Sequence, residues 1–121
     1  MRYALSQEPW LLANCHCSIC RKSHGAAFVT HAVVPEAAFR VVQGAENLSG
    51  YASSPGYLRQ FCKTCGSRLF ETTPRGIVAV SAGGLDTVPR ERPRLHFFVA
   101  DQAPWFTIAD DLPQHEGEPG A

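Results

Sequence analysis

All five cysteines of this 121-residue chain fall within two short motifs, and this constrains the fold more than any other feature. The first motif, Cys15-His16-Cys17-Ser18-Ile19-Cys20, places three thiols in six residues as C-x-C-x-x-C. The second is a C-x-x-C pair, Cys62 and Cys65. Both spacings are typical of metal sites, and sulfurs this close in sequence do not build an ordinary disulfide framework. In a reducing compartment the pattern therefore predicts a small fold held by metal.

The first motif has the features of a working metal site. Arg21 and Lys22 follow it directly, and neighbouring cations favour the thiolate form that binds metal. Three soft ligands suit one Zn²⁺ whose fourth position stays open to something other than protein. The alternative is a structural site closed by a fourth protein ligand, with His16, His24 or His96 as candidates. On an extended backbone His16 should point away from the two flanking ligands, because alternate side chains face opposite sides.

The second motif lies between two segments with strand patterns. Residues 57–61 enter it and residues 66–71 leave it, so strand, tight turn and returning strand would form a zinc knuckle. A thioredoxin-like redox pair is the rival interpretation, and it is disfavoured because no strand-helix-strand alternation surrounds the motif. In a composite alternative, Cys62 and Cys65 share one zinc with the first cluster.

Short strand patterns between turn signals predict a mainly β fold with little helix, built of several short antiparallel sheets around the zinc. We expect strands over residues 3–5, 10–14, 28–34, 39–44, 48–52, 57–61, 66–71, 77–82 and 95–99. The almost wholly apolar run 77–82 predicts a central strand buried on both faces. A helical turn is expected from Ser18 to His24, with Ser18 as its cap and Gly25 as its end. Another is expected over 35–39, with proline at its first position.

Length and charge limit the class of protein. We expect a single zinc-binding β domain over residues 1–113, because a chain of this size holds one core but not two. Residues 114–121 read as a disordered acidic tail. Eleven basic residues balance eleven acidic ones, which argues against nucleic-acid binding. Neither a signal peptide nor a membrane helix is expected, so the predicted protein is soluble and cytoplasmic.

The motifs occur in one characteristic order along the chain. They are Cys15, Cys17 and Cys20 with Arg21 and Lys22, then Gly25, Ala26 and Phe28, then Phe61, Cys62, Cys65, Gly66 and Ser67, and finally His96, Pro104, Trp105, Asp111, Leu112 and Pro113. From about Met1 to Pro113 this order resembles the glutathione-dependent formaldehyde-activating enzyme family, which includes centromere protein V. The resemblance implies a zinc-bearing all-β fold of the kind also found in a Rab-binding chaperone. It further implies carbon-sulfur lyase activity, since the founding reaction forms S-hydroxymethylglutathione from glutathione and formaldehyde.

The resemblance also implies roles for the cysteines. Cys15, Cys17 and Cys20 correspond to the ligands of the family's catalytic zinc. Cys62 and Cys65 correspond to a pair that normally joins an upstream C-x-C to hold a second, structural zinc. That upstream pair has no counterpart here, because it has been lost or because the assigned start lies downstream of it. Since two thiolates do not close a tetrahedral site, we expect this site to be vacant or completed by non-cysteine ligands, at a cost in stability.

The expected activity is lyase chemistry on thiol-aldehyde adducts, with glutathione as the candidate thiol. Zinc would lower the pKa of the thiol so that it binds as a thiolate, a nucleophile for an aldehyde carbon. Arg21 and Lys22 would attract a carboxylate of such a substrate, although solvated cations explain them equally well. The alternative function is a non-catalytic zinc module with structural metal and a protein partner. A zinc-ribbon nucleic-acid binder is disfavoured by the balanced charge.

The remaining candidates are a histidine in an apolar strand and two aromatic residues. His96 is either a satisfied core histidine or a proton carrier that faces the metal. Trp105 and Phe106 read as core rather than as a platform for substrate. His31 and His115 suggest nothing beyond surface or core placement.

Overall fold

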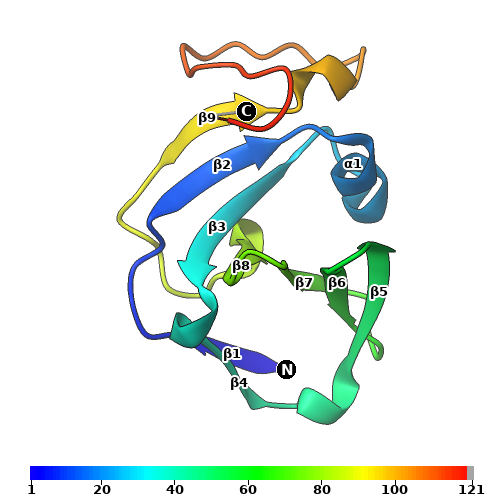
Figure 1. Ribbon diagram of the computed structural model, residues 1–121, viewed down its shortest axis with the longest axis vertical. Helices are drawn as coiled ribbons and strands as arrows, with labels where there is room; N and C mark the ends of the chain where they lie inside the picture. Colours follow the sequence, from blue (N-terminus) through cyan, green and yellow to red (C-terminus); the bar gives the residue numbers. More distant parts are fainter. Residues whose placement is uncertain (120–121) are drawn as a thin grey trace.

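The computed structural model describes residues 1–119 and confirms the predicted mainly β class with little helix (Figure 1). The strands are β1 (Arg2–Leu5), β2 (Leu11–Cys15), β3 (Val29–Pro35), β4 (Phe39–Gln43), β5 (Leu48–Ser54), β6 (Tyr57–Cys62), β7 (Arg68–Thr72), β8 (Ile77–Ser81) and β9 (Pro93–Phe97). The helical elements are α1 (Ser18–His24) and the 3₁₀ turns η1 (Glu36–Ala38), η2 (Ala45–Asn47), η3 (Ala82–Gly84) and η4 (Val99–Asp101).

Seven strands form one strongly curved sheet in the order β5-β6-β7-β8-β3-β2-β9 (Figure 1). Its neighbouring strands are antiparallel, as expected, except that β9 lies parallel to β2. The parallel pair sets Phe97 beside Cys15 and His96 beside Asn14. The last strand of the sheet therefore runs alongside the segment that leads into the first cysteine motif.

The core lies around β8, which is buried on both faces as its apolar run predicts. Val78, Ala79 and Val80 expose 1%, 6% and 0% of their surface, respectively. The strands β1 and β4 form a separate antiparallel pair, and Tyr3 and Phe39 from this pair pack against the core. The pair thus covers the apolar surface that the curved sheet leaves open.

The short helix α1 connects β2 to β3 and has the predicted bounds, but its cap differs from the prediction. The N-cap is Cys17, whose Sγ accepts a hydrogen bond from the Cys20 backbone N–H at 3.3 Å, and Ser18 is already helical. Gly25 ends the helix in the left-handed conformation, at φ 61°, as expected. A cysteine of the motif thus also fixes the start of the helix.

Residues 114–117 of the predicted tail lie beside residues 96–100, to which they are joined by backbone pairing. The His115 backbone N–H donates to the His96 carbonyl at 2.9 Å, and the Phe98 N–H donates to the Gly117 carbonyl at 3.0 Å. Residues 120–121 of the predicted tail lie outside the described residues. The proposed domain limit at residue 113 stays a prediction. Over the described residues, no helix is long and apolar enough to cross a membrane.

Candidate metal centre and its surroundings

The structure brings together the three cysteines of the first motif. Cys15 ends β2, Cys17 caps α1 and Cys20 lies in the first helical turn. Their Sγ atoms all lie within 4.8 Å of one another, a grouping that could hold a metal ion. Cys15 and Cys20 are 3% and 2% exposed, whereas Cys17 is half-buried. A ligand from solution would therefore approach the group on the side of Cys17.

Hydrogen bonds among the three thiols shift their pKa values in opposite directions. Hydrogen bonds from Cys15 and Cys20 hold the pKa of the Cys17 thiol far below its usual range. The pKa of Cys15 is raised, because it donates to Cys17 and Cys20 and because it is buried. Without metal, the cluster thus concentrates its negative charge on Cys17. A bound cation would allow all three sulfurs to act as thiolates.

Among residues 1–119, no other cysteine, histidine, aspartate or glutamate offers a ligand atom within 4.8 Å of all three sulfurs. His31 Nε2 comes near one of them, at 3.6 Å from Cys20 Sγ, but does not join the group. The geometry therefore does not support a structural zinc site in which His16, His24 or His96 is the fourth ligand. The composite alternative finds none either, since Cys62 and Cys65 do not belong to the group.

A buried polar cluster that sequence reasoning missed lies against Cys20. Arg59 Nη1 is 3.4 Å from Cys20 Sγ and forms an ion pair at 3.1 Å with Glu71. The Arg59 Nε–H donates to Ser53 Oγ at 2.8 Å. His31 Nε2 is 3.6 Å from Cys20 Sγ and 3.8 Å from Glu71. Arg59 on β6 lies directly opposite Glu71 on β7. Two opposite charges in neighbouring predicted strands were the sequence feature that could have revealed this pair.

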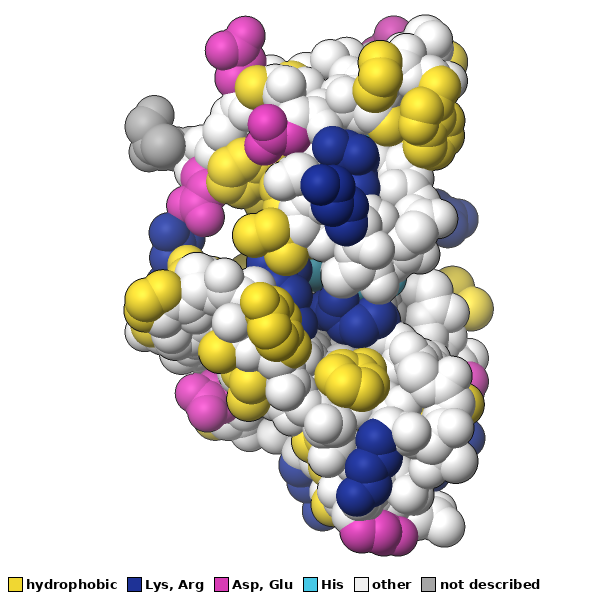
Figure 2. Space-filling model, turned by 90° about the vertical axis from the view of Figure 1, so that its right-hand side faces the viewer, with side chains coloured by type: hydrophobic (Ala, Val, Ile, Leu, Met, Phe, Trp, Pro, Cys, Tyr) yellow, Lys and Arg dark blue, Asp and Glu magenta, His cyan; other side chains and the backbone are white. Residues whose placement is uncertain are grey.

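Positively charged side chains surround this buried polar cluster. Figure 2 shows basic and histidine side chains gathered in a hollow on the face that carries α1 and β5. Burial lowers the pKa of His24 to about 4, helped by Arg68 and Arg59. Burial also lowers the pKa of His31 to about 4, helped by His24 and Arg59. Both histidines are therefore neutral at pH 7, while the two guanidinium groups stay charged.

Acid should therefore destabilise the fold through His31. Its pKa is about 6.5 in an unfolded chain and about 4 when folded, so the unfolded chain binds more protons as the pH falls through this window. The stabilising contribution is complete above pH 6.5 and is lost toward pH 4. Between pH 7 and pH 5 we expect metal-free protein to lose about 1 to 2 kcal/mol of unfolding free energy from this residue. Urea titrations should show a smaller pH dependence for His31→Gln, and an identical dependence would contradict the assignment.

His96 makes its polar contacts away from the thiols, and a role in carrying protons to the metal stays a prediction. Its Nδ1 lies 2.8 Å from His16 Nε2, and its Nε2 lies 2.9 Å from the Asp110 carboxylate. The neighbouring Phe97 is the residue of β9 that packs against the cysteines. Because successive strand residues face opposite sides, His96 belongs to the other face. His96 is the satisfied core histidine, and His16 points away from the thiols as predicted.

The aromatic residues near the C-terminal end divide into one core and one surface residue. Phe106 packs against Phe28 with ring centroids 5.5 Å apart, as expected of core. Trp105 is 72% exposed, so the prediction that it is core was wrong. Its aromatic character did not reveal that the segment turns outward at this position.

The cations that follow the first motif lie on the last turn of α1. The Arg21 Nε–H donates to the Asp101 carbonyl at 2.9 Å, which ties the helix to η4. Lys22 is exposed. Attraction of a substrate carboxylate by these two residues stays a prediction.

The second cysteine motif forms the expected turn between β6 and β7. Cys62 is buried and Cys65 is exposed. Backbone N–H groups of Cys65 and Thr64 lower the pKa of the Cys62 thiol. In the described part of the chain, these two thiols belong to no group of three candidate ligands.

We therefore expect purified protein to hold one tightly bound zinc ion per chain, at the first motif. Cys15→Ser should remove it, and Cys17→Ser should act in the same way if the two residues share an ion. Elemental analysis after dialysis against a weak chelator measures the stoichiometry. Two tightly held ions per chain would contradict the expectation for Cys62 and Cys65.

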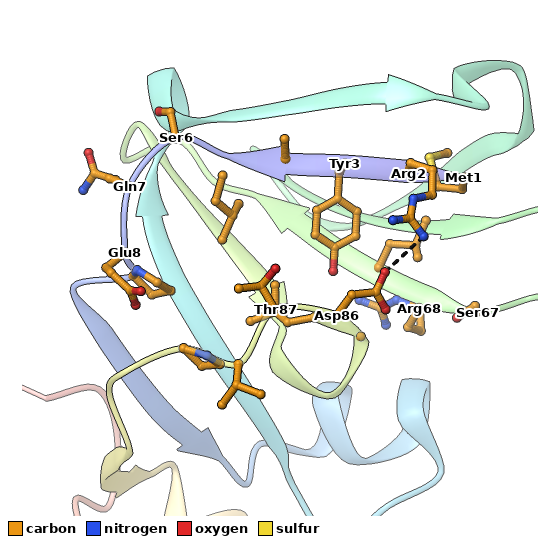
Figure 3. A pocket seen from close by; sticks show the side chains of 18 residues that line it. Met1, Arg2, Tyr3, Ser6, Gln7, Glu8, Ser67, Arg68, Asp86 and Thr87 are labelled. Atoms are coloured by element: carbon orange, nitrogen blue, oxygen red, sulfur yellow. Dashed lines mark ion pairs between the residues drawn. The ribbon is translucent and has the colours of Figure 1, made fainter.

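A pocket of about 590 Å³ lies away from the thiols, between β1, the start of β7 and residues 84–89 (Figure 3). The Tyr3 hydroxyl points into it and is buried without a hydrogen-bond partner. An exposed ion pair of 3.1 Å joins Arg2 and Asp86 at its edge. Because no cysteine lines this pocket, we do not assign the chemistry to it.

Comparison with known proteins agrees with the family resemblance that the order of the motifs suggests. The chain matches the model of the glutathione-dependent formaldehyde-activating enzyme family over residues 1–101. A Halomonas elongata protein, whose name marks it as a candidate glutathione-dependent formaldehyde-activating enzyme, is 34% identical over 113 residues, covering 86% of this chain and 71% of that protein. A crystal structure of a Rhodobacter sphaeroides protein superposes with a TM-score of 0.60 at 26% identity, covering 75% of this chain and 88% of the other. This chain therefore belongs to the glutathione-dependent formaldehyde-activating enzyme family.

Proposed function

We propose that this protein is a zinc-dependent carbon-sulfur lyase that forms or splits adducts between a thiol and an aldehyde, with glutathione and formaldehyde as the model pair. The observation that carries the proposal is the convergence of Cys15, Cys17 and Cys20 without a fourth protein ligand in the described residues. Family membership supports it, because a glutathione-dependent reaction requires a place where a thiol can bind.

The donor set fits zinc, because three thiolates are the soft ligands that this metal prefers. When bound, zinc would supply a Lewis acid that lowers the pKa of a thiol in the open position. The buried sulfurs of Cys15 and Cys20 fix one side of the site, and Phe97 and Phe98 pack against this side and keep water away. The half-buried Cys17 marks the side that is open to the ligand.

The reaction needs little beyond a positioned thiolate. The sulfur attacks the aldehyde carbon, a carbon-sulfur bond forms, and the former carbonyl oxygen takes a proton from solvent. In the reverse direction the hydroxyl loses its proton, the carbon-sulfur bond breaks and the aldehyde leaves. His96 is not required for either step, since it lies on the other face of β9. The metal-type spacing of all five cysteines supports the expected cytoplasmic location, where thiols stay reduced.

The test compares zinc-loaded, metal-free and Cys17→Ser protein for formation of S-hydroxymethylglutathione from glutathione and formaldehyde, followed by NMR exchange. Only zinc-loaded wild type should accelerate exchange above the spontaneous rate, and zinc should restore the metal-free sample. Arg40→Gln, an exposed change on β4, is the control. Glutathione binding without acceleration would favour the non-catalytic zinc module, and no glutathione binding would contradict both the substrate and the open position.

A further inference from the structure

Arg59 is a buried cation in direct contact with the thiol cluster, and the proposed chemistry does not yet use it. The residue is 9% exposed and lies on β6. Its guanidinium is fixed from three sides by Ser53 on β5, Glu71 on β7 and Cys20 on α1. It therefore links β6 to the helix that contains Cys20 and is capped by Cys17.

The ion pair with Glu71 does not by itself explain the contact with sulfur. Glu71 alone compensates the buried charge of Arg59, and neutral sulfur is a weak acceptor. A guanidinium N–H at 3.4 Å from Sγ becomes a strong interaction when the sulfur carries negative charge, as it does in a metal-bound cysteine. Because Nη1 lies 3.4 Å from Cys20 Sγ, this sulfur is in direct contact with a positive charge.

This charge matters most when the ligand is itself an anion. Three cysteine thiolates around a divalent ion carry one net negative charge, and a fourth thiolate adds a second. The mutual repulsion is strong in a site where two of the three cysteines are buried. Arg59 lowers this repulsion for an anionic ligand and offers nothing comparable to a neutral one.

We propose that Arg59 is a positioning residue that makes the cysteine cluster selective for an anionic sulfur ligand over a neutral ligand. The inference rests on the proposed function, since it assumes the open position. It goes beyond that function by naming what sets ligand choice there. Outer hydrogen bonds of this kind tune metal sites without touching the substrate.

The experiment uses Co²⁺-loaded protein and two small probes, 2-mercaptoethanol as the thiolate and imidazole as the neutral ligand. The variant is Arg59→Met/Glu71→Leu, which removes both charges and leaves no buried carboxylate unpaired. Visible absorption titrations should show that the preference for thiol over imidazole falls about tenfold, through weaker thiol binding. The sulfur-to-cobalt charge-transfer band should move to longer wavelength, because the sulfur loses a hydrogen bond. Arg59→Lys should restore part of the preference, and Arg40→Met should change neither readout.

An unchanged preference and an unchanged band in the folded double variant would overturn the proposal. If wild-type protein binds neither probe, the open position of the proposed function fails, and the band position alone then decides the role of Arg59. If the double variant does not fold, Glu71→Gln replaces it. This change should raise the preference for thiol, because the carboxylate no longer offsets the arginine, and a lower preference would overturn the proposal.

Discussion

Arg59→Ala should lower the free energy of unfolding by about 3 to 5 kcal/mol, because it leaves the buried Glu71 carboxylate without its ion-pair partner. Glu71 is 9% exposed, and burial already raises its pKa despite the opposing effect of Arg59 and Arg68. Urea unfolding of metal-free protein, followed by circular dichroism, measures the loss. The loss should shrink as the pH falls, because the raised pKa of Glu71 favours the protonated carboxyl group, which no longer needs a cation.

The double variant Arg59→Met/Glu71→Leu is the matched comparison for this prediction. Apolar side chains of similar volume can replace a buried ion pair at little cost, so its stability should stay within about 1 kcal/mol of wild type. A single variant as stable as the double variant would show that water or a neighbouring group solvates Glu71. The ion pair would then contribute little to the fold.

His96→Ala should destabilise the protein by about 2 to 4 kcal/mol and leave thiol binding within about threefold of wild type. The substitution opens a cavity at a residue that is 1% exposed and removes the partner of the fully buried His16. Thiol binding should persist, because the side chain lies on the face of β9 that is turned away from the cysteines. Thermal unfolding and cobalt absorption titrations measure the two effects.

His115→Ala is the control for this experiment, because the hydrogen bonds that tie His115 to residues 96 and 99 are made by its backbone. Its stability should change by less than about 0.5 kcal/mol. A large loss of thiol affinity in a well-folded His96 variant would show that His96 acts on the metal site. The structure argues for the opposite result.

Local features of the fold followed from local sequence. Strand positions, the bounds of α1 and its Gly25 stop depend on side-chain alternation and turn residues within a few positions of one another. The cap was misassigned to Ser18, because propensity favours serine while the geometry of the motif gives the role to Cys17. Polar composition suggested a frayed tail, yet parallel pairing with β9 extends through Gln114.

By itself, the sequence determined that three sulfurs would converge. The C-x-C-x-x-C spacing holds the three cysteines within six residues at the start of a helix, so their side chains stay close together. The tertiary structure alone decided what surrounds them. Arg59 stands 39 residues from Cys20, and the two meet only because the sheet curves back toward α1. His96 faces away because the register of β9 against β2 places Phe97 opposite Cys15. A shift of one residue would exchange those two faces, and only packing of the whole sheet fixes such a register.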